Sequence, residues 1–261
     1  MRILFIGDII GQPGRRALKH VLPGLKNDRG VDFTVANGEN AAGGFGLTPE
    51  IAEELFRLGV DVLTSGNHIW DKRQILPHLD REPRVLRPAN YPEEVPGRGA
   101  GVFAAPGGAK VGVLNLEGRI YMHPLHSPFT LGRTLAAELK RETPVVLVDF
   151  HAEITSEKRA LGWHLDGRVS AVIGTHTHVQ TADEEILPQG TAYITDAGMT
   201  GGRDSVIGME KAEALHRFLT QTPSRFSPAS GRLCLNAVLI TVEADSGRAV
   251  AVERLQLPVQ P

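Results

Sequence analysis

Seven residues of metal-binding type follow apolar runs in separate parts of this chain. The runs include LFIGD at residues 4–8 and VLVDFH at residues 146–151. A further run, AVIGTHTH at residues 171–178, ends in a His-x-His pair. In an open α/β sheet, a polar residue placed just past a buried strand is where binding and chemistry occur. Five such strand ends that converge on one crevice would form a two-metal centre. The seven residues are Asp8, Glu39, Asn40, Asn67, His151, His176 and His178.

Each of these residues has a plain structural alternative when it is taken alone. Asp8 could cap a helix or occupy a turn, Asn67 could hold a left-handed turn, and His151 could be an ordinary surface histidine. The pair His176 and His178 is a stronger indication, because His-x-His after a glycine is a familiar metal-binding pattern. The joint pattern favours a metal centre, since all five strand ends carry oxygen or nitrogen ligands and none is a cysteine. Such a mixed ligand set suits Mn²⁺, Fe or Zn²⁺, and it argues against a zinc site built from thiolates.

The composition limits the classes of protein to which the chain can belong. It has 261 residues, of which 41% are hydrophobic, enough to bury a sizeable core. A net charge of −2 and no basic stripe argue against a nucleic-acid surface held by bulk electrostatics. A compact phosphate-bearing ligand is compatible with this net charge, because a metal ion would supply positive charge locally. Cys234, the single cysteine, lies in an apolar run and is expected to be a buried, inert thiol.

Targeting and membrane signals are not evident in the sequence. The first apolar run is too short for a signal peptide and lacks a cleavage pattern. A membrane span needs about 18 apolar residues, which no segment reaches. We therefore expect a soluble cytoplasmic protein without a membrane partner.

Strand and helix patterns alternate through the first 175 residues and then change character. After them come short strands, one helix and two β runs that surround the turn Asp245-Ser246-Gly247. This order predicts one domain over residues 1–261, a sheet sandwich covered by helices, with residues 82–108 as a surface excursion. The expected strands are 2–6, 31–36, 60–64, 102–104, 111–116, 145–149, 169–173, 186–187, 192–195, 233–242 and 249–257. The expected helices lie around 17–25, from Thr48-Pro49 onward, at 131–140 and at 210–219.

Motifs along nearly the whole chain resemble the calcineurin-like metallophosphoesterases. The resemblance is strongest to their bacterial YmdB-like branch, whose members are 2′,3′-cyclic-nucleotide phosphodiesterases. It implies an α/β fold, a four-layer α/β/β/α sandwich of two mixed sheets flanked by helices. The matching motifs are GDIIG (7–11), NGENAAGG (37–44), GNHIWD (66–71), DFHAE (149–153) and GTHTHVQTAD (174–183).

Two positions depart from the wider superfamily and agree with the YmdB-like branch. The usual first motif is Asp-x-His, whereas Asp8 is followed by two isoleucines, and Asn40 is expected to fill the vacancy. The bridging ligand, usually an aspartate, would be Glu39. The resemblance implies that one metal is held by Asp8, Glu39, Asn40 and His178. The second would be held by Glu39, Asn67, His151 and His176.

This ligand set suits the hydrolysis of phosphodiesters. Only Asp8 and Glu39 are anionic, so two divalent ions leave the centre positive and stabilise the charge gained in the transition state. A water that bridges both ions has a lowered pKa and attacks phosphorus as hydroxide. His68 is the expected general acid for the departing oxygen. Its alternative role is a hydrogen bond to Asn67 or to a substrate oxygen.

Further residues near the motifs are candidates for contacts to the substrate or to the ligands. Gly43 and Gly44 would let the backbone approach a substrate, and Phe45 could stack on a base, although the same loop could be a mobile surface turn. Arg203 is a candidate phosphate clamp. Hydrogen-bond partners of the histidines are expected in Asp71, Glu153 and Asp183, and Asp71 could equally cap the helix that follows.

The favoured hypothesis is a dinuclear phosphodiesterase acting on small cyclic nucleotides, 2′,3′-cyclic ones first and 3′,5′-cyclic ones as a possibility. Fe or Mn is the expected metal, with Zn or Mg as alternatives. A phosphomonoesterase on the same centre is a rival, which extra cationic side chains near the site would favour. A non-enzymatic regulator that binds a nucleotide or RNA is another. A homo-oligomer is compatible with all of these.

Overall fold

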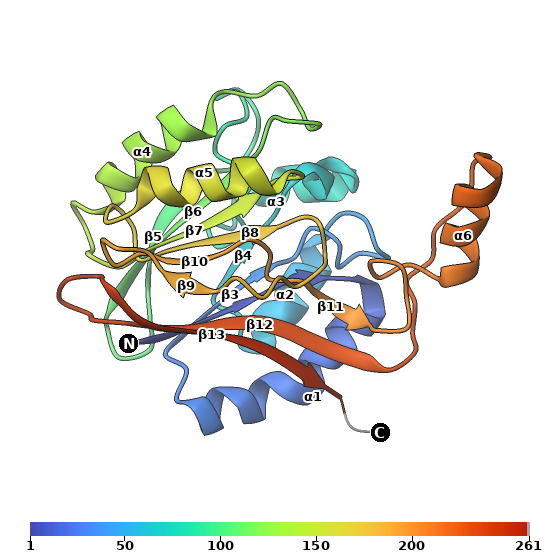
Figure 1. Cartoon of the computed structure of the whole chain (residues 1–261), viewed down its shortest axis with the longest axis horizontal. Coiled ribbons are helices and arrows are strands. Elements are labelled where there is room, and N and C mark those ends of the chain that lie inside the picture. The colour runs from blue at the N-terminus through green and yellow to red at the C-terminus, as the bar shows by residue number, and fades with distance from the viewer. Residues whose placement is uncertain (260–261) are drawn as a thin grey trace.

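The structure, a computed structural model, describes residues 1–259 and contains two mixed β-sheets (Figure 1). The first sheet has the order β2-β11-β12-β1-β3-β4, with β13 paired to β12, and the second has the order β5-β6-β7-β8-β10-β9. The first sheet comprises β1 (Arg2–Ile6), β2 (Asp8–Ile9), β3 (Phe33–Asn37), β4 (Val62–Thr64), β11 (Met199–Gly202), β12 (Leu233–Val242) and β13 (Ala249–Pro258). The second comprises β5 (Ala100–Ala104), β6 (Lys110–Glu117), β7 (Val146–His151), β8 (Ala171–Thr175), β9 (Glu185–Ile186) and β10 (Ala192–Ile194).

Helices cover the outer faces of both sheets (Figure 1). On the first sheet these are α1 (Gly11–Arg29) and α2 (Pro49–Arg57), and on the second they are α4 (Pro128–Leu139) and α5 (Thr155–Leu165). The short helices η1 (Asn67–Trp70), η2 (Arg73–Ile75) and α3 (Leu76–Leu79) follow β4. The last helix, α6 (Lys211–Thr220), projects from the body of the molecule.

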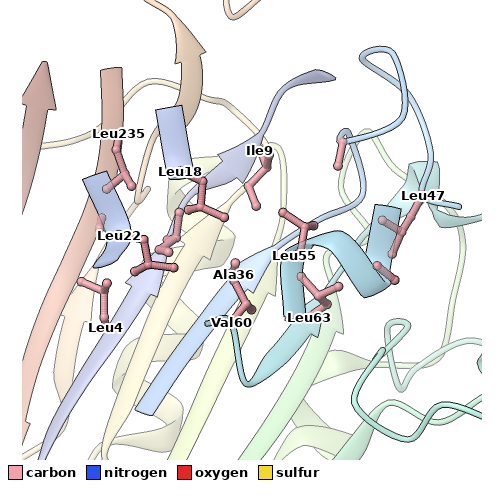
Figure 2. Close-up of a cluster of buried hydrophobic side chains, with 14 of the residues drawn as sticks. Leu4, Ile9, Leu18, Leu22, Ala36, Leu47, Leu55, Val60, Leu63 and Leu235 are labelled. Carbon is pink, nitrogen blue, oxygen red and sulfur yellow. The ribbon is translucent and has the colours of Figure 1, made fainter. Parts of the chain in front are cut away.

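Three layers of apolar side chains hold the sheets and helices together. The alternation along β1 divides its residues between two of them. Leu4 and Ile6 pack with residues of α1 and α2, as Figure 2 shows for Leu4 beside Leu18 and Leu22. Ile3 and Phe5 pack between the two sheets. A third layer joins the second sheet to α4 and α5. The expected α/β/β/α sandwich is therefore confirmed.

Most of the expected elements are present, and their local signals explain why. Thr48 caps α2, because its hydroxyl oxygen accepts the Ile51 amide at 3.4 Å, and Pro49 opens the helix. The expected hairpin is the antiparallel pair β5 and β6. Cys234 is buried, as predicted. The sequence did not reveal α5, whose buried face includes the charged residues Glu157 and Lys158 and therefore lacks an apolar stripe.

One expectation about the chain's organisation is wrong. Residues 82–108 are not a surface excursion, because Val85 and Leu86 are fully buried and Leu86 donates its amide to the Leu63 carbonyl at 2.8 Å. Val85 pairs with Leu63 and extends the edge of the first sheet beyond β4, while Ala100–Ala104 form β5 of the second sheet. The C-terminal β runs are antiparallel to each other, since β12 pairs in that sense with β13. Within the first sheet, β12 lies between β11 and β1 and is antiparallel to β1, with Ile3 opposite Ile240.

The parallel strands of each sheet bring their carboxyl ends to one place. In the first sheet β1, β3 and β4 run parallel, and in the second sheet β6, β7 and β8 do so. Loops at the carboxyl ends of such strands are the usual location of ligand sites in α/β folds. Among residues 1–259, no helix has the length and apolar character needed to cross a membrane.

Candidate metal centre

The seven predicted ligands occupy the carboxyl ends of five strands. Asp8 begins β2 directly after β1, and Glu39 and Asn40 follow β3. Asn67 opens η1 after β4. The remaining three come from the second sheet, where His151 ends β7 and His176 and His178 follow β8. The two sheets thus supply opposite sides of one cluster.

Four of these side chains converge on a single point. The Nε2 atom of His151 lies 3.0 Å from Glu39 Oε1, 3.0 Å from Asn67 Oδ1 and 3.0 Å from His176 Nδ1. Glu39 and His151 are fully buried, and the ligand atoms of Glu39, His151 and His176 all lie within 4.8 Å of one another. One carboxylate, one amide oxygen and two imidazole nitrogens directed at one another form a donor set that fits a divalent transition metal.

The other three side chains lie beside this group and share Glu39 with it. His178 Nε2 lies 3.5 Å from Asp8 Oδ1 and 3.3 Å from Asn40 Nδ2, which in turn lies 3.4 Å from Glu39 Oε1. Asp8 is fully buried, and its Oδ1 has no hydrogen-bond donor among the residues that the structure describes. A buried carboxylate oxygen without a donor is unfavourable unless a cation compensates it. This group therefore also fits a metal ion.

Hydrogen bonds orient the imidazoles so that one nitrogen of each faces the cluster. Asp149 Oδ1 accepts the Thr175 hydroxyl at 2.7 Å, and the Thr175 oxygen therefore accepts from His151 Nδ1 at 3.0 Å. His178 Nδ1 donates to the Ile207 carbonyl at 2.9 Å. His176 Nε2 lies 2.9 Å from Glu153 Oε2. Such partners set the tautomer of a ligating histidine and raise its basicity.

Two residues of this orienting network, Asp149 and Thr175, were not predicted from the sequence. Each lies within its strand, one or two residues before a ligand histidine. Asp149 could have been found from its place two residues before His151, because alternate strand residues point to the same side of a sheet. Thr175 carries no such signal, since it meets His151 through the pairing of β7 with β8. Asp149 is also contacted by Asn37, whose amide nitrogen lies 3.2 Å from Asp149 Oδ2.

The loop that carries His176 and His178 has an unusual backbone, with φ angles of 96° and 64° at the two histidines. Non-glycine residues seldom adopt this left-handed region, and the surroundings must hold them there. Asp196 Oδ2 accepts the amide of Thr177 at 3.2 Å and its hydroxyl at 2.7 Å. Asp196 is in turn paired with Lys158 Nζ at 2.7 Å, and both side chains are almost completely buried.

Charge interactions dominate the titration of the buried ligands. Burial would raise the pKa of Asp8, but the facing His178 brings that pKa down to about 2. Burial likewise opposes the ionisation of Glu39, yet His151 lowers its pKa below the ordinary value. Burial alone would lower the pKa of His151, but Glu39 raises it to about 9. The two carboxylates are therefore ionised at neutral pH and attract positive charge.

His68 lies at the rim of the cluster. Its amide donates to Glu39 Oε2 at 2.9 Å, and its Nδ1 lies 2.9 Å from Asp71 Oδ2. The Phe45 ring and the imidazole pack in a T-shaped arrangement, with 5.0 Å between the ring centroids. Because Asp71 accepts from Nδ1, Nε2 is the imidazole nitrogen left for a substrate.

A cleft of about 470 Å³ opens from the cluster. Its polar end includes Glu39, Asn40, His68, Glu153, His176, Thr177 and His178. Gly44 and Phe45 lie at this end too, where Phe45 packs on His68. The other end is mostly apolar and is lined by Val206, Ile207, Met209, Ala214, Arg217, Phe218, Gln221 and Phe226. The lining of this other end comes from α6 and its flanking segments, which sequence reasoning did not connect with the site.

Three predicted residues are placed differently from expectation. Asp183 does not contact a ligand histidine, since its carboxylate accepts the Thr195 amide at 3.1 Å and the Thr195 hydroxyl at 2.5 Å. Arg203 is exposed, and within residues 1–259 it is not part of the cleft lining. Gly43 is also exposed and outside that lining, whereas Gly44 and Phe45 contribute to it.

Comparison with known proteins identifies the family. Residues 4–255 match the family model described as "YmdB-like protein". This chain belongs to the YmdB-like family. It is 50% identical to the 2′,3′-cyclic-nucleotide 2′-phosphodiesterase of Bacillus subtilis (strain 168), over 98% of this chain and 96% of that protein.

Two solved structures resemble this YmdB-like chain over almost its whole length. A protein of Thermus thermophilus, described as hypothetical, has a TM-score of 0.93 and 43% identity, with 100% of both chains covered. A protein of Mycoplasma pneumoniae, described as a novel phosphatase, has a TM-score of 0.92 and 34% identity. That second match covers 99% of this chain and 93% of the other.

Proposed function

We propose that this YmdB-like chain is a metal-dependent phosphoric diester hydrolase that opens 2′,3′-cyclic nucleotides. The observation that carries the proposal is the convergence of seven oxygen and nitrogen ligand residues from five strand ends beside an open cleft. The 50% identity to a 2′,3′-cyclic-nucleotide 2′-phosphodiesterase, over nearly the full length of both proteins, supports the choice of a 2′,3′-cyclic nucleotide as substrate. Opening the 2′ ester would leave a nucleoside 3′-monophosphate. A 3′,5′-cyclic nucleotide is the second substrate to test.

The proposed centre holds two divalent ions, with Fe or Mn as the first candidates and Zn or Mg as alternatives, since the ligand set mixes oxygen and nitrogen and contains no thiolate. One ion would be held by Asp8, Glu39, Asn40 and His178, and the other by Glu39, Asn67, His151 and His176. The position of Glu39 supports a bridging role, because its Oε1 lies 3.0 Å from His151 Nε2 and 3.4 Å from Asn40 Nδ2. Such ions would lower the pKa of a coordinated water and would place positive charge beside the phosphoryl oxygens.

His68 is the proposed proton donor to the departing oxygen. Asp71 holds its Nδ1 at 2.9 Å, and the His68 amide is tied to Glu39, so the imidazole is oriented at the edge of the cluster. About a third of the His68 side chain is exposed, which lets Nε2 reach a substrate in the cleft. A positioned imidazole contributes roughly 10²–10⁴-fold to such a step.

The cleft lining favours a diester over a monoester substrate. Of the lysines and arginines in residues 1–259, Arg217 alone lines it. A monoester carries more negative charge than a diester, so a monoesterase would benefit from further cationic side chains at the site. The largely apolar remainder suits a substrate whose single negative charge is joined to a less polar group.

The experiment that tests the proposal compares four substrates on one metal-loaded preparation. They are 2′,3′-cyclic AMP, 3′,5′-cyclic AMP, bis-p-nitrophenyl phosphate and p-nitrophenyl phosphate. We expect metal-dependent cleavage of the diesters, with the 2′,3′-cyclic ester fastest and little cleavage of the monoester. Two bound metals without turnover of any substrate would instead favour the nucleotide-binding regulator.

The proton donor is tested with His68→Ala. This variant is expected to keep the metal content of the wild type and to lose on the order of 10²–10⁴-fold in kcat. Loss of metal in the variant would show that His68 is a ligand. Asp71→Asn is a useful companion, because it should keep the metal and lower the rate less than His68→Ala does.

A further inference from the structure

One face of α6 forms a wall of the cleft. Ala214, Arg217 and Phe218 line it, and their spacing of three and four residues places them on one side of the helix. Gln221, the residue with left-handed backbone that follows the helix, also lines the cleft. Of the ten residues in α6, Ala214 is the buried one, so the rest of this face is open toward the cleft. The helix projects from the body of the molecule (Figure 1), and the exposed Leu215 lies on it outside this face.

The position of α6 is tied to that of the metal ligands. The segment before the helix is held by the paired backbone bonds of Val206 and Met209, at 2.9 and 3.0 Å. The segment after it is joined to this one by the bond from the Ala229 amide to the Gly208 carbonyl at 2.8 Å. The Ile207 carbonyl within the first segment accepts from His178 Nδ1. The α6 wall and the metal cluster are therefore linked through adjoining backbone.

The two ends of the cleft differ in chemistry. The cluster end offers histidines and carboxylates, whereas the α6 end offers Phe218, Phe226, Met209 and the guanidinium of Arg217, which lies 5.6 Å from the centroid of the Phe226 ring. A cyclic nucleotide has the same division between a charged diester and an aromatic base. Bases stack on aromatic side chains, and Arg planes take part in such contacts.

Of the aromatic residues, Phe218 is best placed to meet the base. Phe45 already packs against His68 and therefore bounds the reacting end of the cleft. Phe218 lies on α6 at the other end and is 71% exposed, which leaves its ring free for a ligand. Next to it, Gln221 donates its amide nitrogen to the Phe218 carbonyl at 3.0 Å, so its amide oxygen remains available to a base edge.

We propose that Arg217 and Phe218 on α6, together with Gln221 directly after the helix, form the nucleobase subsite of the cleft, with Phe218 as the stacking residue. This inference rests on the proposed function and assigns the part of the substrate that α6 recognises. Stacking on Phe218 would lower KM for a nucleotide without changing the chemical step, because the base lies away from the reacting phosphorus.

The test compares two diesters that share the same five-membered cyclic phosphate. They are 2′,3′-cyclic AMP and methyl β-D-ribofuranoside 2,3-cyclic phosphate, which has no base. The wild type should prefer the nucleotide in kcat/KM by about 5–150-fold, the range of one base–aromatic stack. Phe218→Ala should remove most of this preference through KM while its turnover of the baseless sugar stays at the wild-type value, which also shows that the variant is folded.

Leu215→Ala is the matched control, since Leu215 lies on the same helix outside the cleft and is 53% exposed. It should leave both substrates unchanged. The inference is overturned if the wild type shows no preference for the base, or if Phe218→Ala affects both substrates equally. It is also overturned if Leu215→Ala acts like Phe218→Ala, because the effect would then come from the helix as a whole and not from a ring that faces the cleft. Failure of the proposed function is distinct, since neither diester would be cleaved by the wild type.

Discussion

Replacing Lys158 by methionine should destabilise the protein strongly, because this residue is half of a buried ion pair. Lys158 Nζ lies 2.7 Å from Asp196 Oδ2, and the side chains are 1% and 0% exposed. Removing one partner of such a pair leaves an uncompensated charge and costs about 3–5 kcal/mol. Asp196 would keep three donors, the Thr177 amide, the Thr177 hydroxyl and the Gly198 amide. We therefore expect the lower end of the range, about 3 kcal/mol.

Urea denaturation of the metal-free protein measures this loss directly as a shift in midpoint at unchanged slope. By the usual scaling for chains of this size, the melting temperature should fall by roughly 6–12 °C. Asp196→Asn in the same background should restore part of the loss, because the buried charge is gone while an amide oxygen can still accept from Thr177. A loss below about 1 kcal/mol in Lys158→Met, or no recovery in the double variant, would refute the reasoning.

Three further predictions concern packing, metal binding and reactivity. A Cβ on Gly66 would lie 2.0 Å from His151 Cδ2, so Gly66→Ala should displace that ring, weaken metal binding and lower the free energy of unfolding by about 1–3 kcal/mol. Its control is Gly24→Ala in α1, where a Cβ meets nothing within 4 Å; this variant should raise the free energy of unfolding by about 0.4–1 kcal/mol in the same urea assay. Stripping the metal should lower the melting temperature and returning Mn²⁺ should raise it by about 5–10 °C, and an unchanged value would argue against binding at the buried cluster. Burial raises the pKa of the Cys234 thiol, so iodoacetamide should label it slowly in the folded protein and quickly in urea; rapid labelling of the folded protein would contradict its burial.

The sequence predicted the elements that carry strong local signals and the ligands that follow them. Buried strands such as 2–6 and 145–149 are continuous apolar runs, and the polar residue after each run is visible without a structure. The joint occurrence of Asp8, His151 and His178 at such positions was enough to predict that they meet. Their burial and the contacts around His151 Nε2 then depend on how the two sheets face each other.

Features that depend on long-range pairing were not predictable. Lys158 and Asp196 are 38 residues apart, and a lysine on a helix that lacks an apolar stripe gives no sign that it is buried. The insertion of β12 beside β1 joins strands from opposite ends of the chain. Arg203 resembled a phosphate clamp because two glycines precede it, yet Arg217, on a helix with no motif, is the arginine that lines the cleft.

We propose that the seven converging residues hold two metal ions, which support the cleavage of a cyclic diester. The most direct measurement returns Mn²⁺ in steps to metal-free protein, with bound metal counted per chain and the rate on 2′,3′-cyclic AMP measured in each sample. Our account predicts that the rate rises with the second ion and reaches its limit at two ions per chain. Glu39→Gln should bind fewer than two ions and lose the rate. Full activity with one ion, or with none, would contradict the account.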